Sequence, residues 1–580
     1  MIDILNRTGV ARNARWSAGK RAVGTPNIAF LRTSSFPGPD FAELWLDSEN
    51  GSHMRMASTP DIPLLSLPDS VHVVRSRTKG EDIDGGCFLR AGADEIPDIK
   101  VQASDEVVVL ENAFELRRDA RAFVHAISEL REQVGYTKLI YAPGIMDLSN
   151  LALLVYMGVD LFDSSLLMYR TACGSVSLPE GNMPAEKACW LLRTKDPNEL
   201  RDLNLRNAWN ELQLVRHMIT AGRLRELAEV RSSATPWGMA ALRLFDLDHF
   251  PLQERYTPLT GPRFYANSKQ SLFRPDVWRW RRRVMERWTP APHKKVLLLI
   301  PCSAKKPYFM SRSHQLFREV LMSVPNPGVV QELIVTSPIG VVPRELELYY
   351  PAAQYDIPVT GHWDREEVAM VQQLVARAIG LGFEKVISHL GAESEFVQEV
   401  APAAIDTSLG STTSRDALRR LQEELAAACI SFPNVPRSIE RIESLASAVR
   451  FQFGPGGDAL TEACQVVGNY PYSKIMDGRV QMGMLTPERG MVSLTLEGAA
   501  RLLPQRLNWV EMEDFDLGGN LFAVGVQDAD PNLRVGDEAL VVRKGELEGV
   551  GVAAMCGPEM VASRRGEAVR IRHKRHSIKV

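Results

Sequence analysis

The stretch VLLLIPCSAKKPYFMSRSH (Val296–His314) joins an apolar run to a polar segment and then to a helix start. Val296–Ile300 consists of five apolar residues in succession, which is typical of a strand buried in a parallel sheet. Cys302 follows this run closely, so we expect it at the carboxyl end of a strand, where open α/β sheets place their sites. With the helix predicted over His314–Ser323, the stretch predicts a strand–helix unit of an α/β domain.

The pattern continues through the central region of the chain. We predict further strands and helices at Glu332–Thr336, Arg365–Gly380, Lys385–His389 and Ser414–Cys429. This alternation indicates a compact α/β core domain over residues 295–435, followed by a small α/β domain over 436–505.

Residues 1–288 alternate short apolar runs with amphipathic stretches. The predicted strands are Val107–Leu110, Lys138–Tyr141 and Val159–Phe162, and the predicted helices are Arg117–Gln133 and Asn207–Val230. Such alternation over almost 300 residues predicts a parallel α/β sheet or barrel.

Two local segments are strongly basic. Trp278–Lys295 has seven Lys and Arg residues against one Glu, with interleaved Trp, and the tail Met560–Val580 has the same ratio. Each is either a solvated surface or a contact for RNA phosphates. The short β-rich pieces Phe522–Val526, Ala539–Val542 and Val550–Ala554 predict a small β domain over residues 506–580.

The amino-acid composition limits the classes of protein to which the chain can belong. Of 580 residues, 45% are hydrophobic and 24% charged, as in folded globular proteins, and the net charge of −3 means that any nucleic-acid surface is local. Seven cysteines without a CxxC pair indicate a reducing compartment rather than a disulfide framework or a zinc ribbon. The apolar runs are too short to span a bilayer and no signal peptide is evident, so we expect a soluble cytoplasmic protein without a membrane partner.

Cys302 is the candidate nucleophile of the core domain. Lys305 and Lys306 are adjacent cations and a helix begins soon afterwards, and both features favour the thiolate form of cysteine. The alternative is an inert cysteine that ends a core strand.

A family resemblance rests on the same residues. The spacing Pro-Cys-x3-Lys-Pro-Tyr-x2-Ser-x2-His, met from Pro301 to His314, resembles the signature motif of archaeosine synthase, an archaeal paralogue of tRNA-guanine transglycosylase. The segment Thr336–Trp363 also resembles the core domain of that family.

The N-terminal region resembles transglycosylases and departs from them in two respects. Arg15–Leu31 resembles their opening strands, Ile219–Pro236 their later helices, and Gly158–Ser165 the strand of the nucleophile, with Asp163 at that position. The stretch that carries the second catalytic aspartate has no counterpart here. Of the four positions for a structural zinc, only Cys189 keeps a ligand, since the others are occupied by Lys187, Leu192 and Leu203. We therefore expect a transglycosylase-like (β/α)8 barrel without zinc or base exchange.

The C-terminal region resembles a PUA domain, a small RNA-binding pseudobarrel. The resemblance covers Phe522–Val542, in which Gly536 and Asp537 match a characteristic turn, and Arg564–His576. It implies that RNA is contacted by Gly536, Asp537, Arg564, Arg565, Arg570, Arg572 and Lys574.

The resemblance implies a reaction on tRNA that carries 7-cyano-7-deazaguanine at position 15. Free lysine is added across the nitrile through its side-chain amine, and a partner radical-SAM lyase then cleaves the adduct to archaeosine. A cysteine thioimidate suits this chemistry, which needs neither a redox cofactor nor ATP. A homodimer is a further expectation taken from transglycosylases. The alternatives are a base-exchanging transglycosylase and a non-catalytic tRNA-binding subunit.

The motif also suggests roles for the remaining side chains. Cys302 is the nucleophile, Lys306 lowers its pKa, Tyr308 and Ser311 donate hydrogen bonds to the nitrile nitrogen, and His314 transfers protons because its ordinary pKa lies near neutrality. His314 as a packed helix start is the alternative. Glu345 and Asp356 are reserve candidates for deprotonating or holding lysine. Asp163 is retained either for substrate binding or for structure.

Overall fold

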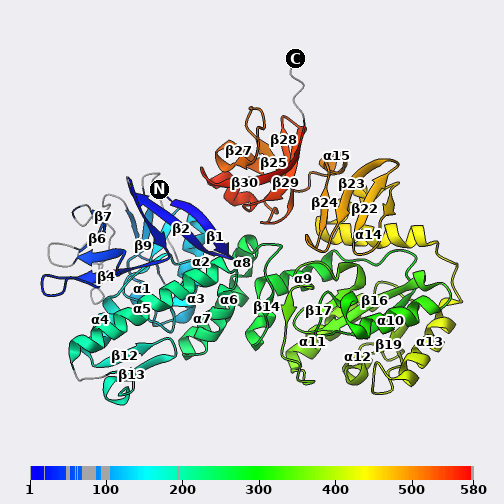
Figure 1. Cartoon of the computed structure of the whole chain (residues 1–580), viewed down its shortest axis with the longest axis horizontal. Helices are drawn as coiled ribbons and strands as arrows, with labels where there is room; N and C mark the ends of the chain where they lie inside the picture. Colours follow the sequence, from blue (N-terminus) through cyan, green and yellow to red (C-terminus); the bar gives the residue numbers. More distant parts are fainter. Residues whose placement is uncertain are drawn as a thin grey trace. The chain divides into compact units, whose positions relative to one another are not determined.

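A computed structural model describes residues 2–18, 20–47, 52–58, 61, 63–67, 86–92, 105–192 and 196–575 (Figure 1). Contacts divide the chain into two compact units. The first comprises Met1–Thr257 with Ala562–Gly566, and the second comprises Pro258–Val561 with Glu567–Val580.

The first unit is built on two sheets. Three antiparallel strands form one of them: β1 (Ile2–Thr8), β2 (Ala11–Ala18) and β3 (Arg21–Thr25). The other has eight strands in the order β7-β6-β5-β4-β11-β10-β9-β8. Its members are β4 (Asn27–Arg32), β5 (Leu44–Asp47), β6 (Ser52–Met56), β7 (Pro63–Leu67), β8 (Gly86–Leu89), β9 (Val107–Leu110), β10 (Leu139–Tyr141) and β11 (Leu161–Asp163).

This larger sheet differs from the regular (β/α)8 barrel that the resemblance predicted. Strands β4, β5, β8, β9, β10 and β11 are parallel, but β6 is antiparallel to both of its neighbours, β5 and β7. Residues 33–43 connect β4 to β5 without a helix. Hairpin pairing replaces helical crossovers in this part of the chain, because antiparallel neighbours need only a short connection.

Helices surround the second half of this sheet. They are α1 (Ala113–Leu116), α2 (Ala120–Val134), α3 (Leu151–Tyr156), α4 (Ser165–Ala172), α5 (Pro197–Thr220), α6 (Leu224–Ser232), α7 (Pro236–Asp248) and α8 (Phe250–Tyr256), with a hairpin of β12 (Ser175–Leu178) and β13 (Gly181–Pro184) after α4. The single helix predicted over Asn207–Val230 is two, because Gly222 adopts a φ of 69° between α5 and α6. Such a left-handed residue ends a helix.

The central sheet of the second unit has the strand order β17-β16-β15-β19-β20. Its strands are β15 (Val296–Pro301), β16 (Val330–Thr336), β17 (Gly340–Pro343), β19 (Lys385–Ser388) and β20 (Ile405–Asp406). Only β17 is antiparallel to its neighbour. As the apolar run predicted, Val296–Ile300 is completely buried in the middle of this sheet.

Helices pack on this sheet in two groups. One group pairs α10 (Arg312–Ser323) with α13 (Arg415–Cys429), and the other joins α9 (Pro275–Glu286), α11 (Arg365–Ile379) and α12 (Ser394–Gln398). Strand β16 lies on one side of β15, and β19 lies on the other. Because crossover connections are right-handed, α10 and α11 lie on opposite faces of the sheet.

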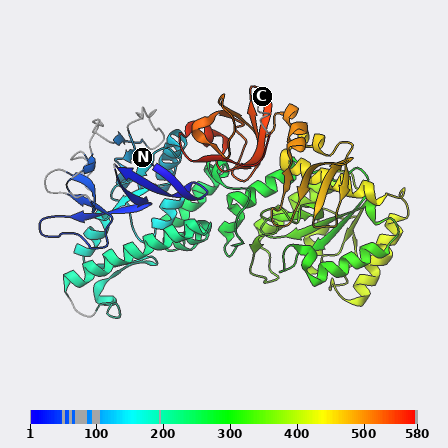
Figure 2. The same ribbon diagram turned by 45° about the horizontal axis from the view of Figure 1, so that its top comes forward.

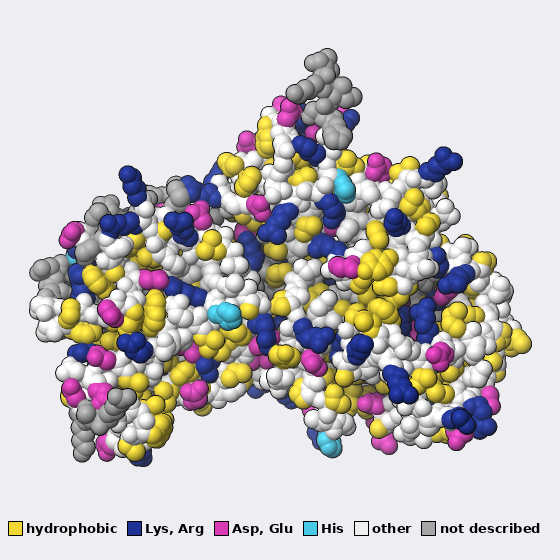
Figure 3. All heavy atoms as spheres, in the orientation of Figure 1, with side chains coloured by type: hydrophobic (Ala, Val, Ile, Leu, Met, Phe, Trp, Pro, Cys, Tyr) yellow, Lys and Arg dark blue, Asp and Glu magenta, His cyan; other side chains and the backbone are white. Residues whose placement is uncertain are grey.

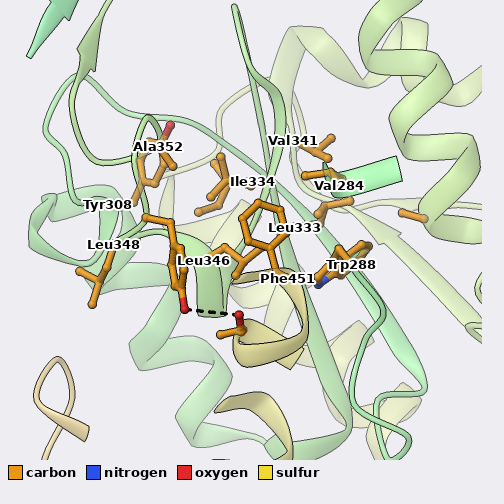
Figure 4. Close-up of a cluster of buried hydrophobic side chains, with 14 of the residues drawn as sticks. Val284, Trp288, Tyr308, Leu333, Ile334, Val341, Leu346, Leu348, Ala352 and Phe451 are labelled. Atoms are coloured by element: carbon orange, nitrogen blue, oxygen red, sulfur yellow. Dashed lines mark hydrogen bonds between the residues drawn. The ribbon is translucent and has the colours of Figure 1, made fainter. Parts of the chain in front are cut away.

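The sequence predicts that the N-terminal domain ends near residue 288. This domain boundary is misplaced, because α9 belongs to the core of the second unit. Trp280 and Trp288 are buried there, and Figure 4 shows Val284 and Trp288 within the cluster that contains Leu333 and Val341. The indole N–H of Trp280 donates to the Val341 carbonyl at 3.0 Å. The tryptophans of the basic segment Trp278–Lys295 that were candidates for RNA contact thus include two core residues.

A two-stranded parallel sheet of the second unit pairs β14 (Phe264–Tyr265) with β18 (Tyr355–Asp356). Two larger sheets follow along the chain, as Figure 2 shows in yellow-orange and red. The four-stranded sheet contains β21 (Gln465–Val467), β22 (Ser473–Asp477), β23 (Val480–Leu485) and β24 (Val492–Leu494), with α14 (Arg437–Phe453) before it and α15 (Leu496–Leu502) after it. The six-stranded sheet contains β25 (Trp509–Met512), β26 (Leu521–Phe522), β27 (Val526–Ala529), β28 (Glu538–Arg543), β29 (Glu546–Ala553) and β30 (Glu567–Lys574), with α16 (Gly557–Ala562). The strand predicted at Phe522–Val526 is interrupted by a 3-10 turn, Ala523–Gly525.

The surface carries both signs of charge. Figure 3 shows Lys and Arg side chains interspersed with Asp and Glu on the visible face, consistent with a net charge of −3. Among the described residues, no helix has the length and apolar character that crossing a membrane requires.

Candidate active site

Cys302 lies at the point where the strand order of the central sheet reverses. The chain runs from β15 to its neighbour β16 and then crosses to β19, on the other side of β15. In open α/β sheets, ligands bind in the crevice outside the carboxyl ends of two such strands. Cys302 directly follows β15 and is partly exposed, and its backbone N–H donates to Val335 at 3.1 Å.

Three groups act on the Cys302 thiol with opposite effects. Burial raises its pKa above the ordinary value, whereas a hydrogen bond with Thr336 and the charge of Lys306 lower it. The carboxylate of Glu393 raises the pKa further. Lys306 thus acts in the direction that the sequence predicted, but the cost of burying the thiolate exceeds the help from its partners, so the pKa of Cys302 is raised.

Lys306 is a buried cation beside the thiol. Its Nζ donates to the Ser303 carbonyl at 3.3 Å and lies 4.1 Å from the centre of the Tyr355 ring. Burial lowers the pKa of Lys306, while the nearby Cys302 and Asp356 raise it. The structure thus brings Cys302, Lys306 and Asp356 near one another.

Tyr308 acts at a distance from the thiol. It is completely buried, and its hydroxyl lies 2.5 Å from that of Tyr355, which in turn hydrogen-bonds Thr336. Burial raises the pKa of Tyr308 well above its usual range, so the phenol stays protonated. Because Thr336 also contacts Cys302, this chain of hydroxyl groups orients the site rather than presenting Tyr308 to a substrate.

Thr336 and Tyr355 were missed by the sequence reasoning, although a signal for Thr336 was present. It ends the predicted strand Glu332–Thr336, which is parallel to β15, so its position at the same sheet edge as Cys302 follows from topology.

Ser311 and His314 have structural roles in the described state. Ser311 is the N-cap of α10 and accepts from the His314 backbone N–H at 3.3 Å. The His314 Nδ1 lies 2.8 Å from the Arg344 guanidinium, which can only donate, so the ring is an acceptor at this nitrogen. Burial and the charge of Arg344 lower the pKa of His314 to about 2. His314 is neutral near pH 7, and the proposed role as proton shuttle is wrong for this state.

Glu345 is occupied by three donors. One oxygen accepts from the Trp288 indole at 2.9 Å and from Ser447 at 3.2 Å, and the other accepts from Gln331 at 2.9 Å. Glu345 therefore joins the segment after α9, β16 and α14, and its role as a lysine ligand is not supported.

The carboxylate of Asp163, in the first unit, also has its hydrogen-bonding capacity filled. Its carboxylate is buried and accepts from the Tyr141 hydroxyl at 2.9 Å and from the backbone N–H groups of Gly144 and Ser165, each at 2.8 Å. These bonds tie the ends of β10 and β11 together. Of the two readings left open, the structure favours the structural one.

Apolar packing occupies two of the four zinc-ligand positions of transglycosylases. Leu192 and Leu203 pack against a hydrophobic cluster around Val176, Ala188 and Leu200, whereas Cys189 is exposed. The residues present do not form a tetrahedral ligand set.

The proposed RNA ligands of the last domain fall into two groups. Gly536 and Asp537 are buried in a turn, in which Asp537 accepts from the Arg534 N–H at 2.9 Å, so their assignment to RNA contact is wrong. Arg572 pairs with the completely buried Glu538, and Lys574 donates to Gly518 at 2.8 Å. Exposed side chains remain at Arg564, Arg565 and Arg570, the last paired with Glu567 at 3.0 Å.

Comparison with known proteins agrees with this architecture. Residues 277–425 match a family model described as "Domain of unknown function (DUF5591)", a range that includes most of α9 and the Cys302 motif. Residues 514–575 match the PUA domain. The chain is therefore a multidomain α/β protein that carries a thiol site at a sheet switch point and a C-terminal PUA domain.

Similarity over the full length identifies the family. The chain is 35% identical to archaeosine synthase subunit alpha of Methanosarcina acetivorans, covering 99% of both chains, and 36% identical to that of Thermococcus kodakarensis, covering 81% of both. It is also 27% identical to a tRNA-guanine(15) transglycosylase of Methanobrevibacter smithii, over 73% of this chain and 64% of the relative. The chain belongs to the archaeosine synthase subunit alpha family.

Proposed function

We propose that this protein is a tRNA-modifying transferase of archaeosine biosynthesis. It adds free lysine to the nitrile of 7-cyano-7-deazaguanine at position 15 of tRNA, and a radical-SAM lyase then acts on the product. The observation that carries the proposal is the partly exposed Cys302, placed beside Lys306 and Thr336 at the switch point of the central sheet. Family membership supports the tRNA substrate.

The reaction we propose has two steps. In the first, the Cys302 sulfur forms a bond to the nitrile carbon, and the nitrile nitrogen gains the thiol proton, giving a thioimidate. In the second, the lysine side-chain nitrogen bonds to the same carbon and the carbon–sulfur bond breaks, which returns the proton-bearing thiol. A nitrile and an ammonium ion together contain all atoms of the amidinium product, so no oxidant, reductant or nucleotide is consumed.

Lys306 is the group best placed to assist the first step. Its charge stabilises the Cys302 thiolate, and its own lowered pKa makes proton exchange with the thiol less costly. Tyr308 and Tyr355 position Thr336, which hydrogen-bonds the sulfur. We assign to Lys306 the transfer of the thiol proton to the nitrile nitrogen, a role that the neutral His314 does not fill.

The first unit and the PUA domain are proposed to bind tRNA without base exchange. A buried Asp163 with three donors is unavailable as a nucleophile, and the zinc positions carry Lys187, Leu192 and Leu203. Exposed Arg564, Arg565 and Arg570 are the proposed phosphate contacts.

Incubation of the full-length protein with nitrile-bearing tRNA and isotopically labelled lysine tests this function. We expect one labelled lysine in each modified tRNA and no release of the base. Release of the nitrile base in exchange for guanine would identify a transglycosylase instead. Binding of tRNA without label transfer, by a folded protein, would identify a non-catalytic subunit.

A further inference from the structure

The carboxyl end of β19 places a second reactive group beside Cys302. Strand β19 pairs with β15 in parallel, with Leu299 opposite Ser388, and the next residue, His389, donates its backbone N–H to Leu299 at 2.9 Å. The chain then turns at Gly391, with a φ of 71°, and reaches Glu393. Topology thus places Glu393 across the switch-point crevice from the nucleophile.

Buried contacts fix the base of this turn. His389 is completely buried, its Nδ1 lies 2.8 Å from the Thr407 hydroxyl, and its Nε2 lies 2.7 Å from the Thr412 carbonyl. These contacts fix the backbone just before Glu393, and a defined origin of this kind helps a side chain that receives a substrate amine.

Glu393 is partly exposed, and the charge of its carboxylate is felt by the Cys302 thiol. Within the described residues, we find no hydrogen bond or ion pair that occupies this carboxylate. An isolated carboxylate beside a nucleophile opposes thiolate formation, so its presence there is unfavourable unless a cation joins the site. The ammonium group of an incoming amine is such a cation.

The other nearby carboxylates are already engaged. Glu347 is completely buried and accepts from Arg344 at 3.0 Å and from Tyr470 at 2.6 Å. Asp356 faces Lys306 and accepts from the Ile357 N–H at 3.0 Å. Asp406 accepts from both the backbone and the hydroxyl of Ser408. Among the described residues, Glu393 is thus the nearby carboxylate for which we find no hydrogen bond or ion pair, whereas Asp356 accepts one local backbone N–H and lies near the Lys306 cation.

We propose that Glu393 binds the side-chain ammonium group of the amine donor and takes one proton from it as the new carbon–nitrogen bond forms. This inference rests on the proposed function and assigns its second step. The nitrogen lone pair forms the bond to the thioimidate carbon, the ammonium proton moves to the Glu393 carboxylate, and the carbon–sulfur bond breaks. The proton held by Glu393 then passes to the leaving sulfur, which leaves an amidinium ion, the Cys302 thiol and a carboxylate ready for another cycle.

The test separates the two steps in the full-length protein. Glu393→Gln should form the Cys302 adduct on nitrile-bearing tRNA as wild type does, measured by mass spectrometry without amine. Decay of that adduct with lysine should be slower by about 10²-fold, the usual scale of acid–base assistance. Glu395→Gln, a change at an exposed residue two positions later, is the matched control and should leave both steps unchanged.

Hydroxylamine distinguishes proton removal from a structural effect, because this nucleophile is already neutral at pH 7. The Glu393→Gln adduct should react with hydroxylamine as fast as the wild-type adduct does, and Glu393→Asp should recover part of the rate with lysine. Equal slowing with both nucleophiles, or wild-type decay with lysine, would overturn the role of Glu393. Failure of the wild-type protein to form any adduct would instead reject the proposed function.

Discussion

The two units each place a family-marked side chain at the carboxyl end of a strand in a largely parallel sheet, yet with opposite outcomes. Asp163, the last residue of β11, accepts three hydrogen bonds and is buried. Cys302 after β15 is partly exposed and faces a hydroxyl, a cation and a carboxylate. The chain itself fills the bonding capacity of the Asp163 carboxylate, which fits a structural role, whereas the Cys302 thiol stays accessible, which is what the proposed reaction requires.

The largest expected difference between the two positions comes from removing each side chain's chemistry. Cys302→Ser should reduce lysine transfer by at least about 10³-fold, as expected for loss of a nucleophile. Asp163→Asn should leave transfer per folded molecule unchanged and lower the free energy of unfolding by about 1–3 kcal/mol, because buried donors lose their acceptor. Labelled-lysine turnover and urea unfolding measure the two effects. Loss of lysine transfer in Asp163→Asn, with normal transfer in Cys302→Ser, would contradict this comparison.

Removal of the cation beside Cys302 should reduce lysine transfer by a smaller factor than removal of the thiol. Lys306→Met should lower transfer by about 10²-fold. It should also shift the alkylation of Cys302 to higher pH, because Lys306 lowers the pKa of that thiol. Lys305→Met removes an exposed neighbouring cation and serves as the control. Identical alkylation profiles for the two variants would show that Lys306 does not act on the sulfur.

Sequence reasoning succeeded where the relevant contacts are local. The apolar run before Cys302, the helix that begins near His314 and the proximity of Lys306 all follow from neighbouring residues. It failed where a distant residue decides. Arg344 is 30 positions from His314 and turns a candidate shuttle into a neutral acceptor, and Glu393 reaches Cys302 only through the pairing of β15 with β19.

Burial was the other quantity that the sequence did not reveal. Trp280 and Trp288 read equally well as RNA contacts or core residues, and only packing against Val341 and Glu345 decides between them. The expected barrel is not confirmed for a related reason. The residues of β6 (SHMRM) alternate between buried and half-buried, and only pairing with β5 and β7 shows that the strand is antiparallel.

A substitution at His314 tests whether this residue is structural, as Asp163 is. The readout is the stability of the protein rather than its turnover. Its pKa is about 2 in the folded protein against 6.5 ordinarily, so the unfolded chain binds more protons between these values. The stability contribution is thus present above about pH 6.5 and is lost as the pH falls. Between pH 7 and 5, His314→Asn should lose about 2 kcal/mol less unfolding free energy than wild type, measured by urea unfolding. Equal losses would mean that His314 titrates normally.

The smallest expected effect concerns the arginines of the PUA domain. Some of them are exposed, and Arg572 is paired with a buried carboxylate. Replacing Arg564 and Arg565 together with Ala should weaken tRNA binding and reduce the salt slope of log K by about 1–2. Arg572→Ala should instead destabilise the fold, because it leaves the buried Glu538 with only the longer ion pair to Arg489 and the Leu494 N–H as partners. Filter binding across salt concentrations and thermal unfolding separate the two. An unchanged slope for the double variant would remove both arginines from the RNA surface.

The central claim is that Cys302 bonds covalently to the nitrile carbon of the tRNA base. Its most direct test is peptide mass spectrometry after the wild-type protein reacts with nitrile-bearing tRNA without lysine and the RNA is then digested with nuclease. The account predicts a mass increase confined to the peptide that contains Cys302, equal to the nitrile-bearing nucleotide remnant, and lost when lysine is added before digestion. An unmodified Cys302 in protein that transfers lysine at full rate, under conditions that preserve a thioimidate, would contradict it.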